Sequence, residues 1–121
     1  MIAEKNFKEQ RKFPRASRNV PVKISQADGD IVTETVNISR AGAYCKVGKY
    51  IEPMTKLKVN LLLPGAKGSG SNGKKISCEG VVVRVVEVNY ENAYNLAIFF
   101  NDLNQRDAEL ISDYVNAQLE E

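Results

Sequence analysis

The stretch LKVNLLLPG, residues 57–65, is the clearest indication of the fold class of this chain. Apolar side chains occupy every second position from Leu57 to Leu63, with Lys58 and Asn60 between them. Alternation at period two predicts a β-strand, because successive side chains of a strand point to opposite faces. Proline followed by glycine marks a turn. The stretch is therefore predicted to form a strand that ends in a turn.

Five further segments have the same character, and together they predict a small all-β domain. Valine, isoleucine, tyrosine and phenylalanine recur in short runs separated by turn residues. The expected strands cover residues 20–24, 31–38, 43–47, 57–63, 76–88 and 93–100. Six short strands with turns between them predict a sandwich or a small barrel.

The pattern then changes, and a helix is predicted over about residues 104–119. Asn104 is a suitable N-cap, and Asp107 in the first turn interacts favourably with the helix dipole. Apolar residues recur at helical spacing, at Ala108, Ile111, Val115 and Leu119. We expect one amphipathic C-terminal helix that packs on the barrel or closes one of its ends.

Length and composition favour one domain. A chain of 121 residues is long enough to bury a core without disulfides or metals. No apolar run reaches the length of a membrane span, and the N-terminus lacks the apolar region of a secretory signal. We expect a flexible arm over residues 1–10, a single domain over residues 11–121, a cytoplasmic location and no membrane insertion.

The two cysteines, Cys45 and Cys78, lie in apolar, strand-like segments. They are predicted to be buried, reduced thiols, since disulfides are rare in cytosolic proteins. The sequence leaves a bridge between them open.

Charge is spread unevenly along the chain, although the net charge is only +2. Residues 1–18 hold six basic and two acidic side chains, whereas residues 101–121 hold one basic and six acidic ones. The basic end suggests an anionic partner, and the acidic end argues against general adhesion to nucleic acid.

Catalysis is disfavoured, because the chain contains no histidine and no paired-carboxylate motif. The glycine-rich stretch 64–75 matches the start of a phosphate-binding loop. However, Lys75 stands where such a loop needs serine or threonine, and a strand follows. We expect a flexible hairpin there, no catalytic site, no metal and no enzyme activity.

Two arginines near the N-terminus form the first functional motif. Arg11 and Arg15 stand four positions apart, but Pro14 biases the segment away from a helix, so both are expected on a loop or extended arm. An arginine can bond two acceptors at once, such as guanine O6 and N7 or two phosphate oxygens. A solvated basic arm is the alternative interpretation.

The second motif, NISRAG over residues 37–42, lies between two expected strands. Asn37 and Ser39 are turn formers and Gly42 can adopt positive φ, so a plain turn explains the motif. The same short polar groups at a strand end can also hydrogen-bond a base edge or a phosphate. Neither motif decides the function by itself.

Together, Arg11-x-x-x-Arg15 and Asn37-x-Ser39-x-x-Gly42 resemble the two-part signature of the PilZ family of cyclic di-GMP receptors, R-x-x-x-R and D/N-x-S-x-x-G. The likeness extends over nearly the whole chain. It implies a six-stranded antiparallel β-barrel of the split type with a C-terminal α-helix. It also implies cyclic di-GMP as the ligand, with no other cofactor.

The resemblance implies a role for each matching residue. Arg11 and Arg15 would grip guanine edges and phosphates. Asn37 and Ser39 would contact a guanine, and Gly42 would keep the backbone turn that lets the ligand approach. A further arginine in a later strand, Arg84, would lie beside the ligand and stack on a purine.

One departure from the family pattern concerns the last strand. Where the family often has Y-G-x-G, this chain has Tyr94-Asn95-Leu96-Ala97. If those glycines allow close approach of the ligand, their replacement by Asn95 and Ala97 changes affinity or stoichiometry.

The primary hypothesis is a cytoplasmic bacterial receptor that binds cyclic di-GMP and signals to a protein effector by ordering its arm. The receptor is expected to be a monomer or a homodimer and to bind no DNA or RNA. A PilZ-like protein-interaction adaptor with weak or no nucleotide binding is the alternative. A barrel that binds single-stranded nucleic acid would need exposed aromatic residues on a basic strand face. Apart from Tyr44, the aromatic residues of the expected strands cluster in 94–100, where alternation places at least half of them in the core.

Overall fold

The structure, a computed structural model, describes residues 14–27, 29–64, 73–88 and 92–119 of the chain. In this part of the chain, strands come first and a helix follows. The elements are β1 (Pro21–Gln26), β2 (Gly29–Ser39), β3 (Gly42–Val47), β4 (Lys56–Leu63), β5 (Lys74–Val88), β6 (Ala93–Phe100) and α2 (Gln105–Leu119). The flexible arm expected over residues 1–10 and the glycine-rich stretch 65–72 lie outside the described residues.

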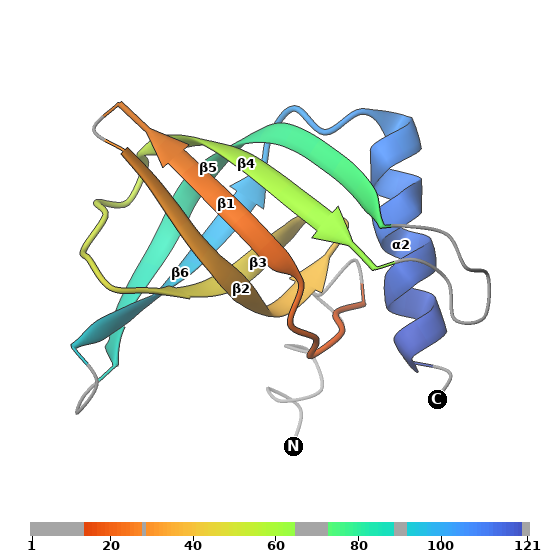
Figure 1. The fold of residues 1–121 in the computed structure, drawn as a ribbon, viewed down its shortest axis with the longest axis horizontal. Coiled ribbons are helices and arrows are strands. Elements are labelled where there is room, and N and C mark those ends of the chain that lie inside the picture. Colours follow the sequence, from red (N-terminus) through yellow and green to blue (C-terminus); the bar gives the residue numbers. More distant parts are fainter. Residues whose placement is uncertain (1–13, 28, 65–72, 89–91, 120–121) are drawn as a thin grey trace, which may run out of the picture.

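The strands form one closed barrel (Figure 1). Its strand order is β1-β2-β3-β6-β5-β4, and every neighbouring pair is antiparallel. The ladder between β1 and β4 closes the sheet, with Val22 opposite Leu61 and Ile24 opposite Val59. Closure pairs the edges that an open sheet would expose. The predicted six-stranded antiparallel barrel is confirmed, and the sandwich alternative is wrong.

In strand β4, apolar residues at every second position of the sequence become buried side chains of the barrel. Leu57, Val59, Leu61 and Leu63 are each no more than 3% exposed, whereas Leu62 is 42% exposed. Strands β1 and β3 show a similar alternation, so their apolar residues meet those of β4 inside the barrel and their polar residues face outward. The barrel interior is therefore an aliphatic core.

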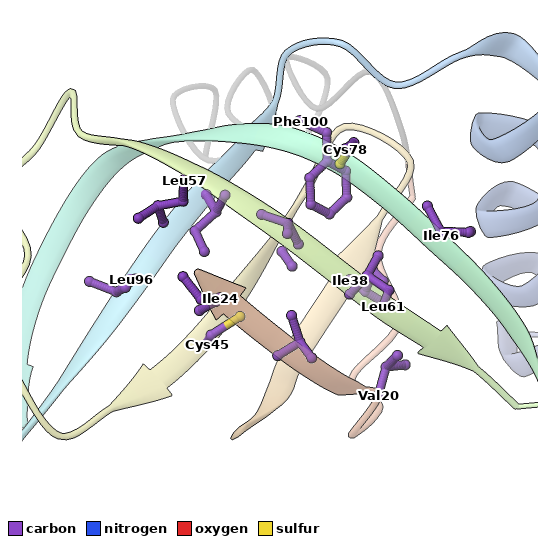
Figure 2. Packing of buried hydrophobic residues seen from close by; sticks show 14 of the residues in the cluster. Val20, Ile24, Ile38, Cys45, Leu57, Leu61, Ile76, Cys78, Leu96 and Phe100 are labelled. Carbon is purple, nitrogen blue, oxygen red and sulfur yellow. The ribbon is translucent and has the colours of Figure 1, made fainter. Parts of the chain in front are cut away.

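This core fills the barrel, and Figure 2 shows part of it. Its largest fully buried side chains include Ile24, Ile38, Leu61, Ile76, Leu96 and Ile111. Cys45 and Cys78 are buried in the same cluster as free thiols (Figure 2). The interpretation of both cysteines as buried thiols is confirmed, and no bridge joins them.

Helix α2 lies at one end of the barrel (Figure 1). Asn104 caps it, since its Oδ1 accepts a hydrogen bond from the backbone N–H of Asp107 at 2.8 Å. Ile111 and Val115 are buried and belong to the barrel core, as their spacing predicts; the side chain of Leu119 lies outside the described part. Within the residues that are described, no helical segment has both the length and the low polarity that crossing a bilayer requires.

Burial of the two thiols makes the fold sensitive to alkaline pH. Desolvation raises the pKa of Cys45 from 9.0 to about 12. Desolvation, followed by the charges of Asp102 and Asp107, raises the pKa of Cys78 to about 12. The unfolded chain therefore loses these protons at lower pH than the folded chain does. We expect the thiol contribution to the free energy of unfolding to be complete below about pH 9 and to be lost as pH rises toward about 12.

Urea denaturation followed by circular dichroism at several pH values measures this dependence. The Cys45→Ala, Cys78→Ala double variant is the control, because it keeps every other titrating group. Its stability is expected to be lower at neutral pH and to fall less steeply under alkaline conditions. An equally steep fall in both proteins would contradict the assignment to the thiols.

Candidate functional site

The residues before β1 pack against the C-terminal half of β2. Ala16 and Ile38 form an antiparallel bridge, in which the backbone N–H of each donates to the carbonyl of the other at 3.0 Å. The segment that follows Pro14 is therefore extended where it meets β2, and Phe13, whose conformation the proline was expected to restrict, lies outside the described residues. Because Arg15 directly precedes the bridge, its backbone is held beside β2.

Thr35 of β2, which was not predicted as a site residue, anchors this segment. Its hydroxyl is buried, donates to the Arg18 carbonyl at 2.7 Å and accepts from the Val20 N–H at 2.9 Å. The Thr35 backbone N–H donates to the Val20 carbonyl, and its carbonyl accepts from the Asn19 side-chain amide. The polar groups of Thr35 thus hold residues 18–20 in place. The only signal in the sequence is a hydroxyl at an inward position of a strand.

Arg15 meets the second motif directly. Its Nη1 donates to Asn37 Oδ1 at 2.7 Å, although 22 positions separate the two residues in sequence. Arg15 is exposed and Asn37 is half-buried. The structure therefore brings together one residue of each motif. Arg11 lies outside the described residues.

Asn37 and Arg84 reach the outer surface because each follows a β-bulge. Thr35 and Val82 both point into the barrel and are fully buried. The register shifts between Thr35 and Asn37 in β2, and between Val82 and Arg84 in β5. One extra valine in each strand interrupts the alternation, so the next residue points outward where regular alternation would turn it inward.

Strand register places these two residues at the ends of one line across the barrel. Asn37 lies opposite Tyr44 of β3, Tyr44 lies opposite Ala97 of β6, and Ala97 lies opposite Arg84 of β5. Three strand spacings of about 4.8 Å separate the ends, so the line is about 14 Å long. We call this surface, with Arg15 beside Asn37, the outer-face site.

Ser39 takes part in the turn between β2 and β3. It is 1% exposed, and its Oγ accepts a hydrogen bond from the backbone N–H of Ala41 at 3.1 Å. The turn is also tied to β6, because the Phe100 N–H donates to the Ala41 carbonyl. A turn-forming role accounts for Ser39 as it stands here. A ligand contact from Ser39 stays a prediction, and it requires the buried hydroxyl to become accessible.

Gly42 serves close strand packing rather than an unusual backbone angle. Among the described glycines, only Gly29 has φ in the positive region, so the explanation of Gly42 by positive φ is wrong. A Cβ at position 42 would lie 2.1 Å from the carbonyl oxygen of Ile98 in β6. The residue must be glycine because β3 approaches the β6 backbone too closely for any side chain.

Two aromatic residues on this surface were not predicted to belong to the site. Tyr44 lies in the line itself, and Phe99 is 49% exposed opposite Gly42. Because Gly42 has no side chain, nothing on β3 stands directly beside Phe99. Outward strand positions were the available signal for both residues. An exposed ring such as that of Phe99 provides a flat surface on which a base can stack.

The two residues that stand where glycines were expected also lie on this surface. Ala97 is part of the line, and Asn95 lies two positions earlier on the same face of β6, opposite Lys46. The Asn95 Oδ1 atom is buried and has no hydrogen-bond partner among the residues described. Both side chains cover part of the outer surface of β6 that glycine would leave exposed.

The outer-face site has the chemistry of an anion site with stacking surfaces. Arg15 and Arg84 place one guanidinium at each end, and the line between Asn37 and Arg84 holds no carboxylate. Guanidinium groups bind phosphates and guanine edges through paired donors. In the described part of the chain, no three His, Cys, Asp or Glu side chains gather as a metal site.

Comparison with known families identifies the fold. A family model described as PilZ domain matches residues 9–117, which include both motifs and all six strands. The chain belongs to the PilZ domain family. A search of curated proteins found no match.

Solved structures share the fold of this PilZ domain. The Bacillus subtilis inhibitor of motility, MotI/DgrA, superposes with a TM-score of 0.79 at 21% identity, over 93% of this chain and 52% of that one. The PilZ domain of Escherichia coli YcgR with c-di-GMP has a TM-score of 0.66 at 8% identity, over 92% of each chain. The MrkH–c-di-GMP complex of K. pneumonia has a TM-score of 0.67 at 13% identity, over 92% of this chain and 53% of that one. This PilZ domain therefore spans about half of the MotI/DgrA and MrkH chains.

The substitution Thr35→Val tests the anchor of this PilZ domain. Valine keeps the shape of the side chain but leaves the Val20 N–H and the Arg18 carbonyl without their buried partner. We expect the free energy of unfolding, measured by urea denaturation, to fall by about 1–3 kcal/mol.

Thr33→Val is the matched control on the same strand, because the Thr33 hydroxyl donates to the Lys46 carbonyl at an exposed position. The control is expected to lose less than about 1 kcal/mol. Equal losses in the two variants would show that Thr35 has no special anchoring role.

Proposed function

We propose that this PilZ domain is a cyclic di-GMP receptor that passes the signal to a protein effector. The observation that carries the proposal is the 2.7 Å hydrogen bond between Arg15 and Asn37, which joins the two motifs. Support also comes from YcgR and MrkH, whose structures contain c-di-GMP. The domain acts as a non-enzymatic cytoplasmic bacterial module, monomer or homodimer, without a nucleic-acid partner.

The role of each residue follows from the charge and shape of the ligand. Cyclic di-GMP carries two phosphates and two guanines, so Arg15 and Arg11 bind phosphate oxygens and guanine edges through paired, charge-assisted bonds. Asn37 and Ser39 hydrogen-bond a guanine edge. At the far end of the line, the planar group of Arg84 stacks on a purine.

Ligand binding transmits a signal by favouring one arrangement of the segment before β1. The Arg15–Asn37 bond occupies groups that the ligand also uses, so binding replaces or shares that bond. Arg18 in the same segment donates from Nε to Gln118 Oε1 of α2 at 2.6 Å. A displaced segment therefore changes contacts at the helix as well as at the site.

Isothermal titration calorimetry with cyclic di-GMP tests the receptor function. Wild type is expected to bind, and Arg11→Ala and Arg15→Ala are each expected to weaken binding by at least about tenfold, since each removes a charge-assisted bond. Binding should weaken further as salt is raised.

Arg106→Ala on α2 is the control, because it removes an exposed arginine outside the site. It is expected to leave affinity unchanged. The proposal fails if wild type shows no binding at high micromolar ligand, or if Arg106→Ala weakens binding as much as Arg15→Ala does.

The position of Ala97 supports a second candidate function, a protein-interaction adaptor with weak or no nucleotide binding. Ala97 lies between Tyr44 and Arg84, and its methyl group stands on the surface that a ligand would cover. Under the receptor function, Ala97→Gly is expected to raise affinity in the same titration. Glycine should also lower the free energy of unfolding by about 0.5–1 kcal/mol.

Ala93→Gly on the same strand is the matched control, since Ala93 is buried and away from the line. It should lower stability without raising affinity. If wild type and Ala97→Gly both fail to bind while remaining folded, the adaptor function is favoured.

A further inference from the structure

A groove of about 400 Å³ lies on the outer surface of β1 and β4. Three neighbouring strands supply most of its lining, at Pro21, Lys23, Asn60, Leu62, Lys75 and Ser77. In the closed ring of strands, β1 and β4 stand opposite β6 and β3, which carry the middle of the outer-face site. We call this hollow the β1–β4 groove, and it is remote from the residues proposed to bind nucleotide.

Apolar side chains are exposed in the β1–β4 groove. Val32 of β2, at one border, is 77% exposed, and Leu62 of β4 is 42% exposed. Both point away from the barrel core, so their apolar surface contributes nothing to the interior. Apolar side chains that line a hollow and are rimmed by polar groups mark an interaction surface.

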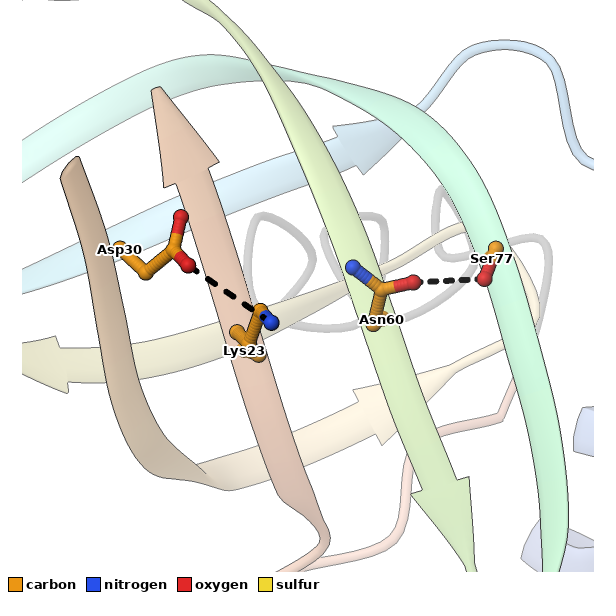
Figure 3. A network of polar contacts seen from close by, with 4 residues as sticks. All are labelled: Lys23, Asp30, Asn60 and Ser77. Atoms are coloured by element: carbon orange, nitrogen blue, oxygen red, sulfur yellow. Dashed lines mark hydrogen bonds and ion pairs between the residues drawn. The ribbon is translucent and has the colours of Figure 1, made fainter. Parts of the chain in front are cut away.

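Polar side chains cross the groove in a row that begins beside Val32, because Lys23 lies opposite Val32 and Asn60 lies opposite both Lys23 and Ser77. Ser77 Oγ donates to Asn60 Oδ1 at 2.6 Å, and Lys23 Nζ lies 3.6 Å from Asp30 Oδ2; dashed lines in Figure 3 mark both contacts. The first bond occupies an acceptor of Asn60 and leaves its amide N–H groups as donors. Both side chains of the ion pair are about half exposed, so Lys23 can exchange Asp30 for another carboxylate at little cost. The row therefore offers mainly donors to a partner.

Lysines on adjacent strands extend this donor character. Lys75 lines the groove, and Lys58 lines a neighbouring hollow of about 800 Å³ that shares Asn60 and Ser77 with it. Within the described residues, neither lysine forms an ion pair. Lys58 lies directly opposite Glu79 of β5, which also accepts a hydrogen bond from the Asn101 amide at 2.9 Å. Lys75, which lies opposite Leu62, is therefore the cation at the β4–β5 border of the groove.

We propose that the β1–β4 groove docks an acidic segment of a partner protein. One apolar side chain of that segment lies between Val32 and Leu62, and its carboxylates face Lys23 and Lys75. Charge complementarity selects this occupant, because an apolar hollow with Lys23 and Lys75 at its border and amide donors on Asn60 matches a hydrophobic residue flanked by acids. The inference goes beyond the proposed function, since docking on this face does not require nucleotide binding.

An anionic membrane or a nucleic acid fits the groove less well. Asp30 and Glu34 point outward from β2 near the lysines and would repel a uniformly anionic surface. Strands β1 and β4 contain no aromatic side chain on which a base could stack. The mixed charge of this face therefore favours a protein segment.

Selection of binding peptides from a phage library tests the proposal. The bait is the full chain, and the probe is a library of random peptides about 12 residues long. We expect selected peptides to share an apolar residue flanked by aspartate or glutamate. Their affinity, measured by fluorescence anisotropy, should fall by at least about tenfold in Val32→Ser and in Lys75→Glu.

Val83→Ser is the matched control for Val32→Ser, because Val83 is also an exposed valine, at 53%, but lies on the bulge of β5. It should leave peptide affinity unchanged. Arg15→Ala should also leave peptide affinity unchanged, so that a loss of peptide binding at the groove is distinguished from a loss of nucleotide binding at the outer-face site. The proposal is overturned if selected peptides lack acids, if Val32→Ser and Lys75→Glu bind them as wild type does, or if no peptide is enriched. It is equally overturned if only phosphatidylglycerol vesicles, an oligothymidine strand or a second copy of the chain binds the face.

Discussion

Closure of the sheet through the β1–β4 ladder is the constraint on which the rest of this structure depends. With the two edges paired, every strand has one face sealed inside the barrel and one face in solvent. The sealed face takes the aliphatic residues and both thiols. The solvent face is then free for recognition, and the ring of strands separates it into the outer-face site over β3 and β6 and the β1–β4 groove on the other side.

Local departures from the regular barrel create the outer-face site. Two bulges turn Asn37 and Arg84 outward, and the buried hydroxyl of Thr35 holds the preceding segment so that Arg15 reaches Asn37. Gly42 contributes by letting β3 and β6 approach each other. The site thus depends on backbone irregularities that cost regular pairing but are supported by a rigid core.

The fold could be predicted from the sequence because its signals are local. Alternation in residues 57–63 and the cap at Asn104 act over a few positions, and both appear in the structure as expected. The site could be predicted only in part. The motifs pointed to Asn37 and Arg15, and the turn contact of Ser39 is local, but the packing role of Gly42 depends on β6, which lies more than fifty positions later in the chain.

The sequence by itself determined the strands, the helix, the buried thiols and the residue types available for binding, because periodicity and composition are properties of neighbouring positions. Only the tertiary structure decided which of those residues share a surface. A bulge of one residue turns every later side chain of the strand to the opposite face of the sheet. The period of the sequence does not indicate at which position strand pairing accommodates the extra residue. Arg15, Asn37 and Arg84 therefore meet on one surface only once the barrel has closed and its register is set.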